Sequence, residues 1–251
     1  MIVDAHAHVS DSDYGNVDIL LKQLDQAGID KAVCVPGGMV DVRKMTRYIM
    51  GMEKPNAAIP NHVVREAVEA HPDRLWGFVC LNPLEGDKAI DMLDEGVGWG
   101  AKGVKLAPIV HRFPLRSEAL AAVCERAGKE GLPVYSHVMP EPDVSTQAFA
   151  GLAEQFKGTR FVLGHMGFGP ADMDAIDLTA AHDNLWLETS LGNYLALKMA
   201  LEKLGPKKLI FGSEFPLAHP KVQLENIRLL DAEGQDDILS GNILALIHEE
   251  A

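Results

Sequence analysis

The chain has 251 residues, of which 47% are hydrophobic and 24% are charged, a balance typical of a folded globular protein and not of a disordered or fibrous one. Its formal net charge of −13 at pH 7 would repel nucleic-acid phosphates and anionic membrane surfaces, so we expect neither as a partner. No stretch approaches the roughly 18 consecutive apolar residues of a membrane span, and the first residues do not resemble a signal peptide. We therefore expect a cytoplasmic protein.

Eight short apolar runs are predicted to be β-strands buried on both faces, because their apolar residues are nearly continuous. Their ends fall near His8, Pro36, Leu81, Leu106, His137, His165, Thr189 and Ser213. Most of the stretches between them have the three- and four-residue spacing of amphipathic helices. In residues 117–131, for example, Leu120, Val123 and Ala127 share one face, and Ser117 can cap the first turn.

This alternation of strands and helices predicts an α/β protein with a (β/α)8 TIM-barrel fold, forming a single domain over residues 1–251. An open doubly wound sheet is the structural alternative, but the first strand is not followed by the Gly-rich phosphate loop that such sheets usually contain. A Gly-, Met- and Pro-containing insertion at about residues 37–60 is expected near the active-site mouth. The last forty residues predict two closing helices.

Polar side chains recur where these strands end. Asp4, His6 and His8 alternate along the first strand, so we expect them to share its inward face. Two histidines this close together are only a weak sign of a metal site. His137, His165 and Glu214, however, stand at the ends of the fifth, sixth and eighth strands, and a barrel builds its active site from the carboxyl ends of its strands.

These side chains suit a catalytic metal centre. Imidazole and carboxylate groups bind zinc and related divalent metals, and such a metal lowers the pKa of water that it binds. The predicted ligands are His6, His8, His137 and Glu214. A structural zinc site would favour cysteines close together in the sequence, whereas the three cysteines here are widely spaced.

Six ordered motifs resemble the amidohydrolase superfamily, in particular the amidohydrolase-2 branch of aminocarboxymuconate-semialdehyde decarboxylase, aromatic-acid decarboxylases and dicarboxylate lactonases. The motifs are "DAHAH", "GVKLAP", "LPVYSH", "FVLGHMG", "LIFGSEFP" and "ILSGNILALI". The resemblance implies one divalent metal ion, with zinc as the first choice, held by the four predicted ligands. It further implies that His165 activates water or polarises the substrate, and that Glu214 also transfers protons. Some lactonase-like members work without a metal.

One residue departs from this branch, which usually has aspartate where this chain has Glu214. Glutamate keeps the charge, but its extra methylene would place the carboxylate about 1.5 Å further out, and a misplacement of about 1 Å can lower a rate about 100-fold. Glu214 could therefore shift the metal, act as a base without ligating, or weaken the enzyme.

Lys105, on the fourth predicted strand, is expected to meet a substrate carboxylate or an internal acid. In some superfamily members a lysine on this strand is carboxylated and bridges two metals, but one metal is usual in the branch that this chain resembles. We expect a metal-dependent hydrolase that cleaves an ester, lactone or amide bond of a small carboxylated compound. The alternatives are a decarboxylase of a cyclic or unsaturated acid, and a catalytically impaired barrel with a binding role. The resemblance also suggests a homo-oligomer.

Overall fold

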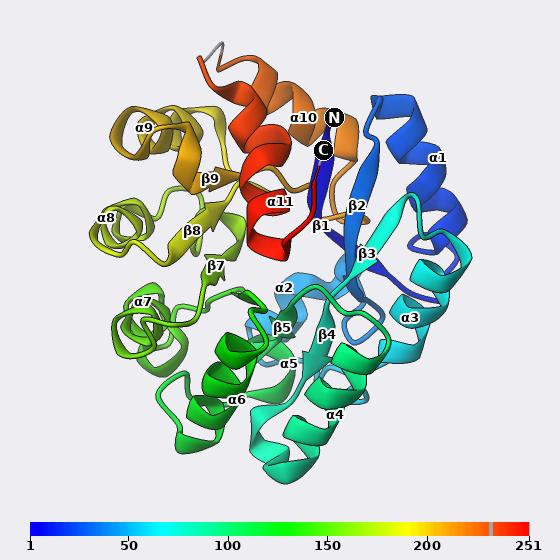
Figure 1. Ribbon diagram of the computed structural model, residues 1–251, viewed down its shortest axis with the longest axis vertical. Coiled ribbons are helices and arrows are strands. Elements are labelled where there is room, and N and C mark those ends of the chain that lie inside the picture. The colour runs from blue at the N-terminus through cyan, green and yellow to red at the C-terminus, as the bar shows by residue number, and fades with distance from the viewer. Residues whose placement is uncertain (231–232, 251) are drawn as a thin grey trace.

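The computed structural model describes residues 1–230 and 233–250, so residues 231–232 and 251 of the predicted domain lie outside the described residues. Its strands are all parallel and form a ring surrounded by helices, as Figure 1 shows. They are β1 (Val3–Val9), β2 (Lys31–Pro36), β3 (Leu75–Gly77), β4 (Val79–Leu81), β5 (Val104–Leu106), β6 (Val134–Ser136), β7 (Phe161–Leu163), β8 (Leu185–Glu188) and β9 (Leu209–Ile210).

Hydrogen bonds close this ring at two places. Phe78 separates β3 from β4, and its N–H donates to the carbonyl of Cys34 in β2 at 2.9 Å, so β3 and β4 together serve as the third barrel strand. On the opposite side, the N–H of Ala5 in β1 donates to the carbonyl of Phe211 just beyond β9, also at 2.9 Å. The predicted (β/α)8 barrel is confirmed.

Each of the first seven barrel strands is followed by at least one α-helix that returns the chain to the next strand, and among the described residues two α-helices follow the last strand. The helices are α1 (Val17–Ala27), α2 (Met45–Ile49), α3 (Asn61–Ala70), α4 (Asp87–Gly98), α5 (Pro108–His111), α6 (Glu118–Lys129), α7 (Thr146–Gln155), α8 (Met173–Ala181), α9 (Tyr194–Leu204), α10 (Pro220–Arg228) and α11 (Asn242–Ile247). The Ser117 side chain accepts a hydrogen bond from the N–H of Leu120, which confirms the predicted cap of α6. None of the described helices has the length and apolar character that crossing a membrane requires.

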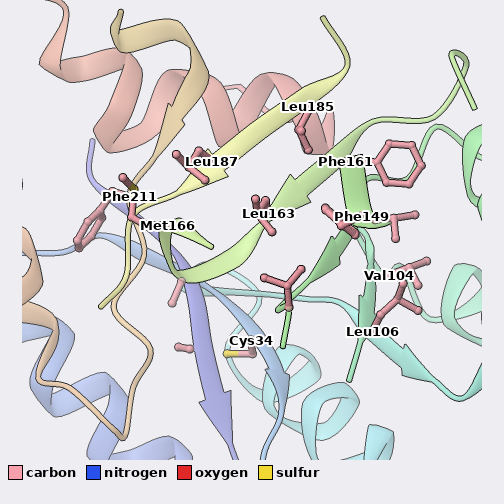
Figure 2. Packing of buried hydrophobic residues seen from close by; sticks show 14 of the residues in the cluster. Cys34, Val104, Leu106, Phe149, Phe161, Leu163, Met166, Leu185, Leu187 and Phe211 are labelled. Atoms are coloured by element: carbon pink, nitrogen blue, oxygen red, sulfur yellow. The ribbon is translucent and has the colours of Figure 1, made fainter. Parts of the chain in front are cut away.

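The main hydrophobic core lies between the barrel and its helices. Val104 and Leu106 of β5, Leu163 of β7 and Leu187 of β8 face outward into this layer, where Phe149 of α7 joins them (Figure 2). The alternate residues of the same strands face the barrel axis. This alternation explains the continuous apolar runs in the sequence, because both faces of each strand are buried.

A second apolar cluster fills the barrel at the amino-terminal ends of its strands. Val3 of β1, Val33 of β2 and Val162 of β7 pack there with Ile243 and Ile247 of α11, which lies across this end of the barrel in Figure 1. The amino-terminal end of the barrel is thereby closed, and the opposite, carboxyl-terminal end remains for the pocket described below.

The prediction that Asp4, His6 and His8 share the inward face of β1 is wrong for Asp4, because β1 contains a β-bulge. Asp4 aligns with Ala32 and Ala7 with Cys34, so three steps along β1 match two along β2. One extra residue therefore lies between Asp4 and Ala7. As a result, Asp4 faces the helices, and its Oδ1 accepts hydrogen bonds from the N–H groups of His6 (3.1 Å) and Ser213 (2.8 Å).

The bulge leads to a prediction about how stability depends on pH. Burial raises the pKa of Asp4 to about 6, although hydrogen bonds from Ser213 and His6 act in the opposite direction. Because the folded-state pKa exceeds the unfolded value, the contribution of Asp4 to stability falls as the pH rises from about 4 to 6, by up to about 1.4 kcal/mol per unit. We expect Asp4→Asn to gain stability relative to wild type over this range.

Urea unfolding at pH 4.5 and pH 7 measures this difference. Asp91→Asn, on an exposed position of α4, serves as the control because it should leave the difference between the two pH values as it is in the wild type. Equal changes in the Asp4→Asn and wild-type proteins between the two pH values would contradict the prediction.

The insertion predicted at about residues 37–60 lies over the carboxyl-terminal end of the barrel. It contains a short 3-10 helix, Val42–Lys44, followed directly by α2. Met39 packs on Cys80 and Ala107, while Tyr48 packs on Ile109 and Met139. The insertion therefore covers part of the carboxyl-terminal end of the barrel.

Candidate active site

The predicted site residues gather at the carboxyl-terminal end of the barrel. The bulge in β1 turns both His6 and His8 toward the barrel axis, while Ala7 and Val9 face the outer core. His165 and Glu214 lie just beyond β7 and β9, both in the left-handed backbone conformation with φ of 60°. Residues other than glycine rarely adopt this conformation, which is unfavourable by roughly 1 kcal/mol or more, and such outliers cluster at functional sites.

His6 is the centre of the cluster and is completely buried. Its Nδ1 lies 2.7 Å from the hydroxyl of Tyr135 and 2.9 Å from Oε2 of Glu214. Its Nε2 lies 3.1 Å from the amino group of Lys105. His8 lies next to it, with Nε2 3.6 Å from Oε1 of Glu214. The strand-1 histidines and the strand-8 acid therefore do converge.

His8 is oriented by the backbone. Its Nδ1 lies 3.1 Å from the carbonyl oxygen of Pro36. Because a carbonyl can only accept, Nδ1 must hold the proton, which leaves the lone pair of Nε2 directed toward Glu214. Burial lowers the pKa of His8 to about 3, so the ring stays neutral and Nε2 can bind a metal.

Glu188 at the end of β8 is a central residue that the sequence interpretation missed. It is fully buried, and it accepts hydrogen bonds from the hydroxyl of Tyr135 (2.7 Å), the N–H (2.6 Å) and hydroxyl (2.8 Å) of Ser190, and the N–H of His165 (3.1 Å). Burial alone would raise its pKa, but contacts with His6, His165 and Tyr135 lower it to about 2. Glu188 is thus an ionised carboxylate beneath the site.

Ser190 links Glu188 to His165 through hydrogen bonds. Its hydroxyl donates to Glu188 and also lies 2.8 Å from Nδ1 of His165. Since the hydroxyl proton is used by Glu188, the oxygen of Ser190 accepts from Nδ1–H of His165. Nε2 of His165 is then an acceptor, which suits a group that takes a proton from water or substrate.

Two glycines make room for the buried polar groups. A Cβ added at Gly164 would overlap the hydroxyl of Tyr135, and one added at Gly212 would overlap the carboxylate of Glu188. Each glycine directly precedes a polar strand-end residue in the sequence, in "LGH" and "FGS". The close approach of Tyr135 and Glu188 to the backbone thus requires glycine at both positions.

His137 lies apart from the ligands that the sequence grouped with it. Its Nε2 accepts a hydrogen bond from the N–H of Ile109 in α5 (3.1 Å), and its ring centre is 6.4 Å from that of His165. Burial, with the nearby charge of Lys105, holds the pKa of His137 well below its usual range. The ring is therefore neutral and has its proton on Nδ1, which makes it a hydrogen-bond donor.

Lys105 extends from β5 into the centre of the barrel. It is 1% exposed, and its amino group lies 4.0 Å from the centre of the Tyr135 ring as well as beside His6. Burial lowers its pKa to about 8, while the charges of Glu214 and Glu188 partly compensate. The contacts of Lys105 in the described residues are thus with His6 and Tyr135, and its two expected roles, toward a substrate carboxylate or an internal acid, stay predictions.

The donor set fits a divalent metal ion. Among the described residues, His6, His8 and Glu214 form one group whose ligand atoms lie within 4.8 Å of one another, and His6, His165 and Glu188 form a second. Oε2 of Glu214 is buried without a hydrogen-bond partner. Burial would raise the pKa of Glu214, but His165, His6 and His8 hold it well below its usual range, so the carboxylate is ionised, with Nδ1 of His6 2.9 Å from this oxygen. A cation would satisfy it.

A pocket of about 390 Å³ opens above these groups. His8, Lys105, His137, His165 and Glu214 lie on its floor, and the insertion and the loops after the strands form its walls. Its size is that of a site for a small molecule. Five of the six site residues expected from the sequence therefore border one cavity, and His6 lies buried next to them without lining it. His137 borders the cavity but belongs to neither ligand group.

Solved structures support the fold. The 5-carboxyvanillate decarboxylase of Sphingomonas paucimobilis has a TM-score of 0.73 at 15% identity, covering 99% of each chain. A probable 2-pyrone-4,6-dicarboxylic acid hydrolase of Acinetobacter baumannii, with bound citric acid, has a TM-score of 0.70 at 17% identity, covering 98% of this chain and 99% of its own. The dihydroxybenzoic acid decarboxylase of Polaromonas, with bound manganese and 2-nitroresorcinol, has the same TM-score and identity, covering 98% and 96%.

Sequence comparison identifies the family. No curated protein sequence is significantly similar to this chain. The sequence profile of the amidohydrolase family, in contrast, matches residues 3–248, which include both histidines of β1, His165 and Glu214. This match confirms the resemblance seen in the ordered motifs. The chain therefore belongs to the amidohydrolase family.

Proposed function

We propose that this protein is a divalent-metal-dependent hydrolase that cleaves an ester, lactone or amide bond in a small carboxylated compound. The observation that supports the proposal most directly is the buried carboxylate of Glu214, whose Oε2 has no hydrogen-bond partner of good geometry and lies 2.9 Å from Nδ1 of His6, at a pocket of small-molecule size. Membership of the amidohydrolase family and the enzymes among the similar structures agree with a catalytic role.

His6, His8 and Glu214 would hold the metal. Zinc is the ion that we propose, and manganese, found in a similar structure, is the alternative. When bound, a divalent ion supplies Lewis-acid polarisation of a substrate oxygen and a lower pKa for water. Because Lys105 lies beside Nε2 of His6, its amino group must move away if that nitrogen binds the ion.

The residues around the ligands have complementary hydrogen-bonding roles. His165 accepts a proton through Nε2, since Ser190 occupies its Nδ1. His137 donates through Nδ1 to the oxygen that becomes negative during the reaction, since Ile109 occupies its Nε2. Glu214 transfers a proton between water and the leaving group. Lys105 stabilises a negative charge on the substrate at the floor of the pocket.

Product analysis tests this proposal. Zinc- and manganese-loaded protein is incubated with lactones, aryl esters, anilides and hydroxybenzoates, and both bond cleavage and carbon dioxide are measured. We expect hydrolysis. The alternative is a decarboxylase, which the two decarboxylase structures favour, and carbon dioxide release without hydrolysis would assign that reaction. Absence of both activities and of bound metal would favour an impaired barrel with a binding role.

Metal binding is predicted to depend on His6. We expect His6→Ala to lose most of the metal that wild type retains after dialysis, because Glu214 and His8 alone provide too few ligands. Metal content is measured by mass spectrometry. His62→Ala is the control, since His62 is exposed on α3. Full metal content in both His6→Ala and His8→Ala would remove these residues from the ligand set.

A further inference from the structure

The walls of the active-site pocket are apolar. The insertion provides Met39, Met45 and Ile49, and the opposite walls include Val110, Met139 and Phe168. Among the described residues that line the pocket, none is an arginine and Lys105 is the only lysine. Charged groups are therefore confined to the floor, where Glu214 lies beside the histidines.

Five of the six charged side chains of the insertion form ion pairs with one another: Arg43 with Asp41, and Lys44 and Arg47 with Glu53. Arg43 binds Asp41 through two hydrogen bonds, Nε to Oδ1 at 2.8 Å and Nη2 to Oδ2 at 2.9 Å. The hydroxyl of Tyr14 donates to the same Asp41 at 3.3 Å, and the guanidinium of Arg43 stacks on the Tyr14 ring. This nearby guanidinium is therefore already paired outside the pocket lining.

The buried charges of the floor limit how many anionic groups a ligand can bring. Lys105 is the only cationic side chain among the described residues that line the pocket, and the metal would lie beside Glu214 on the same floor. A carboxylate bound at the floor would therefore be paired with cations, whereas a second carboxylate would have to lie unpaired against methionine and isoleucine side chains, which is strongly unfavourable.

We propose that this pocket selects a compound with a single carboxylate, bound at the floor, and an apolar body that fills the space under the insertion, and that it excludes dicarboxylates. This substrate class rests on the proposed function, since it assumes that the floor binds a metal. Met39, Met45 and Ile49 are the specificity-determining residues, because they form the wall that a second carboxylate would meet.

Three benzoates test the proposal by isothermal titration calorimetry with the zinc-loaded protein. Benzoate provides one carboxylate, 4-propylbenzoate adds an apolar chain, and terephthalate adds a second carboxylate at the same ring position. We expect 4-propylbenzoate to bind more tightly than benzoate, by about fourfold for each methylene that is buried. We expect terephthalate to bind at least about 100-fold more weakly than benzoate.

A cation placed in the wall should reverse this order. We expect Met45→Lys to bind terephthalate at least about tenfold more tightly than wild type does, and 4-propylbenzoate more weakly. Met52→Lys, in the same insertion but 63% exposed and outside the pocket lining, is the matched control and should behave as wild type. Val42→Lys, also in the wall, replaces Met45→Lys if that variant does not fold.

The outcomes separate this inference from the proposed function. Terephthalate binding within threefold of benzoate, no binding of any of the three acids, or an unchanged ligand order in a folded wall variant would overturn the selectivity. Because these measurements need no turnover, a protein that binds the acids in the expected order but neither hydrolyses nor decarboxylates any compound would overturn only the proposed function.

Discussion

Glu214→Gln is expected to lower kcat/KM about a thousandfold while leaving the fold intact. The amide has the same shape as the carboxylate, but it cannot take up a proton and it removes the negative charge that faces His6 at 2.9 Å and His8 at 3.6 Å. General acid–base catalysis alone contributes about 10²- to 10⁴-fold. Steady-state kinetics on the best substrate from the product analysis measures the loss.

The backbone at this position should survive the substitution. The N–H of Glu214 donates to the carbonyl of His6 at 2.9 Å, and glutamine keeps that bond. Glu225→Gln, on α10 and outside the pocket lining, is the control for a change from carboxylate to amide. Activity of Glu214→Gln within threefold of wild type would show that this carboxylate takes no part in the reaction.

A companion variant, Glu214→Asp, restores the residue that is usual in the branch that this chain resembles. The shorter side chain withdraws the carboxylate by about 1.5 Å from imidazoles that are placed for glutamate, and we expect kcat/KM to fall about 100-fold. A rise in activity would mean that the extra methylene impairs the site, which is the third outcome considered for this residue.

Glu188→Ala is expected to destabilise the protein by about 3–5 kcal/mol, among the largest effects of any single substitution. The change leaves the hydroxyl of Tyr135 and the N–H groups of Ser190 and His165 without their buried acceptor. Each such unsatisfied group is unfavourable by about 1–3 kcal/mol, although relaxation and water reduce the sum. Urea unfolding at pH 7 measures the loss.

Two comparisons identify the cause of the loss of stability in Glu188→Ala. Glu202→Ala, in an exposed ion pair with Lys198 on α9, should change stability by no more than about 1 kcal/mol. Tyr135→Phe combined with Glu188→Ala should be less destabilising than the sum of the two single changes, because the two side chains share a hydrogen bond. Additive losses, or a loss equal to that of Glu202→Ala, would contradict the assigned network.

The fold was largely predictable from the sequence, because buried parallel strands leave continuous apolar runs and each helix has a regular spacing. His6, His8, His165 and Glu214 were found for the same reason: each follows or ends such a run. The hydrogen-bond partners of the histidine ring nitrogens, and the left-handed backbone of His165 and Glu214, were not predictable. Which nitrogen of His137 is occupied, for example, depends on Ile109, whose N–H reaches it only when α5 turns directly after β5.

Glu188 was not predicted as a site residue because no motif in the adjacent sequence indicates a functional role. It stands in "LWLETS", an apolar strand with one acid, and its partners Tyr135 and His165 are distant in sequence. They meet only because neighbouring barrel strands place their inward residues side by side. The glycines at 164 and 212 were visible, but their purpose becomes clear only when the groups that they accommodate are in place.

The bulge in β1 acts as a change of phase within a single strand. Before it, Val3 and Ala5 point to the barrel axis and seal one end against α11; after it, His6 and His8 point to the same axis and form the reactive end. A strand of strict alternation could not present Ala5 and His6 on one side. Deleting a single residue between Asp4 and Ala7 would therefore turn the inward side chains of one half of β1 outward. The strand could then either seal the amino-terminal end of the barrel or direct its histidines to the axis, but not both.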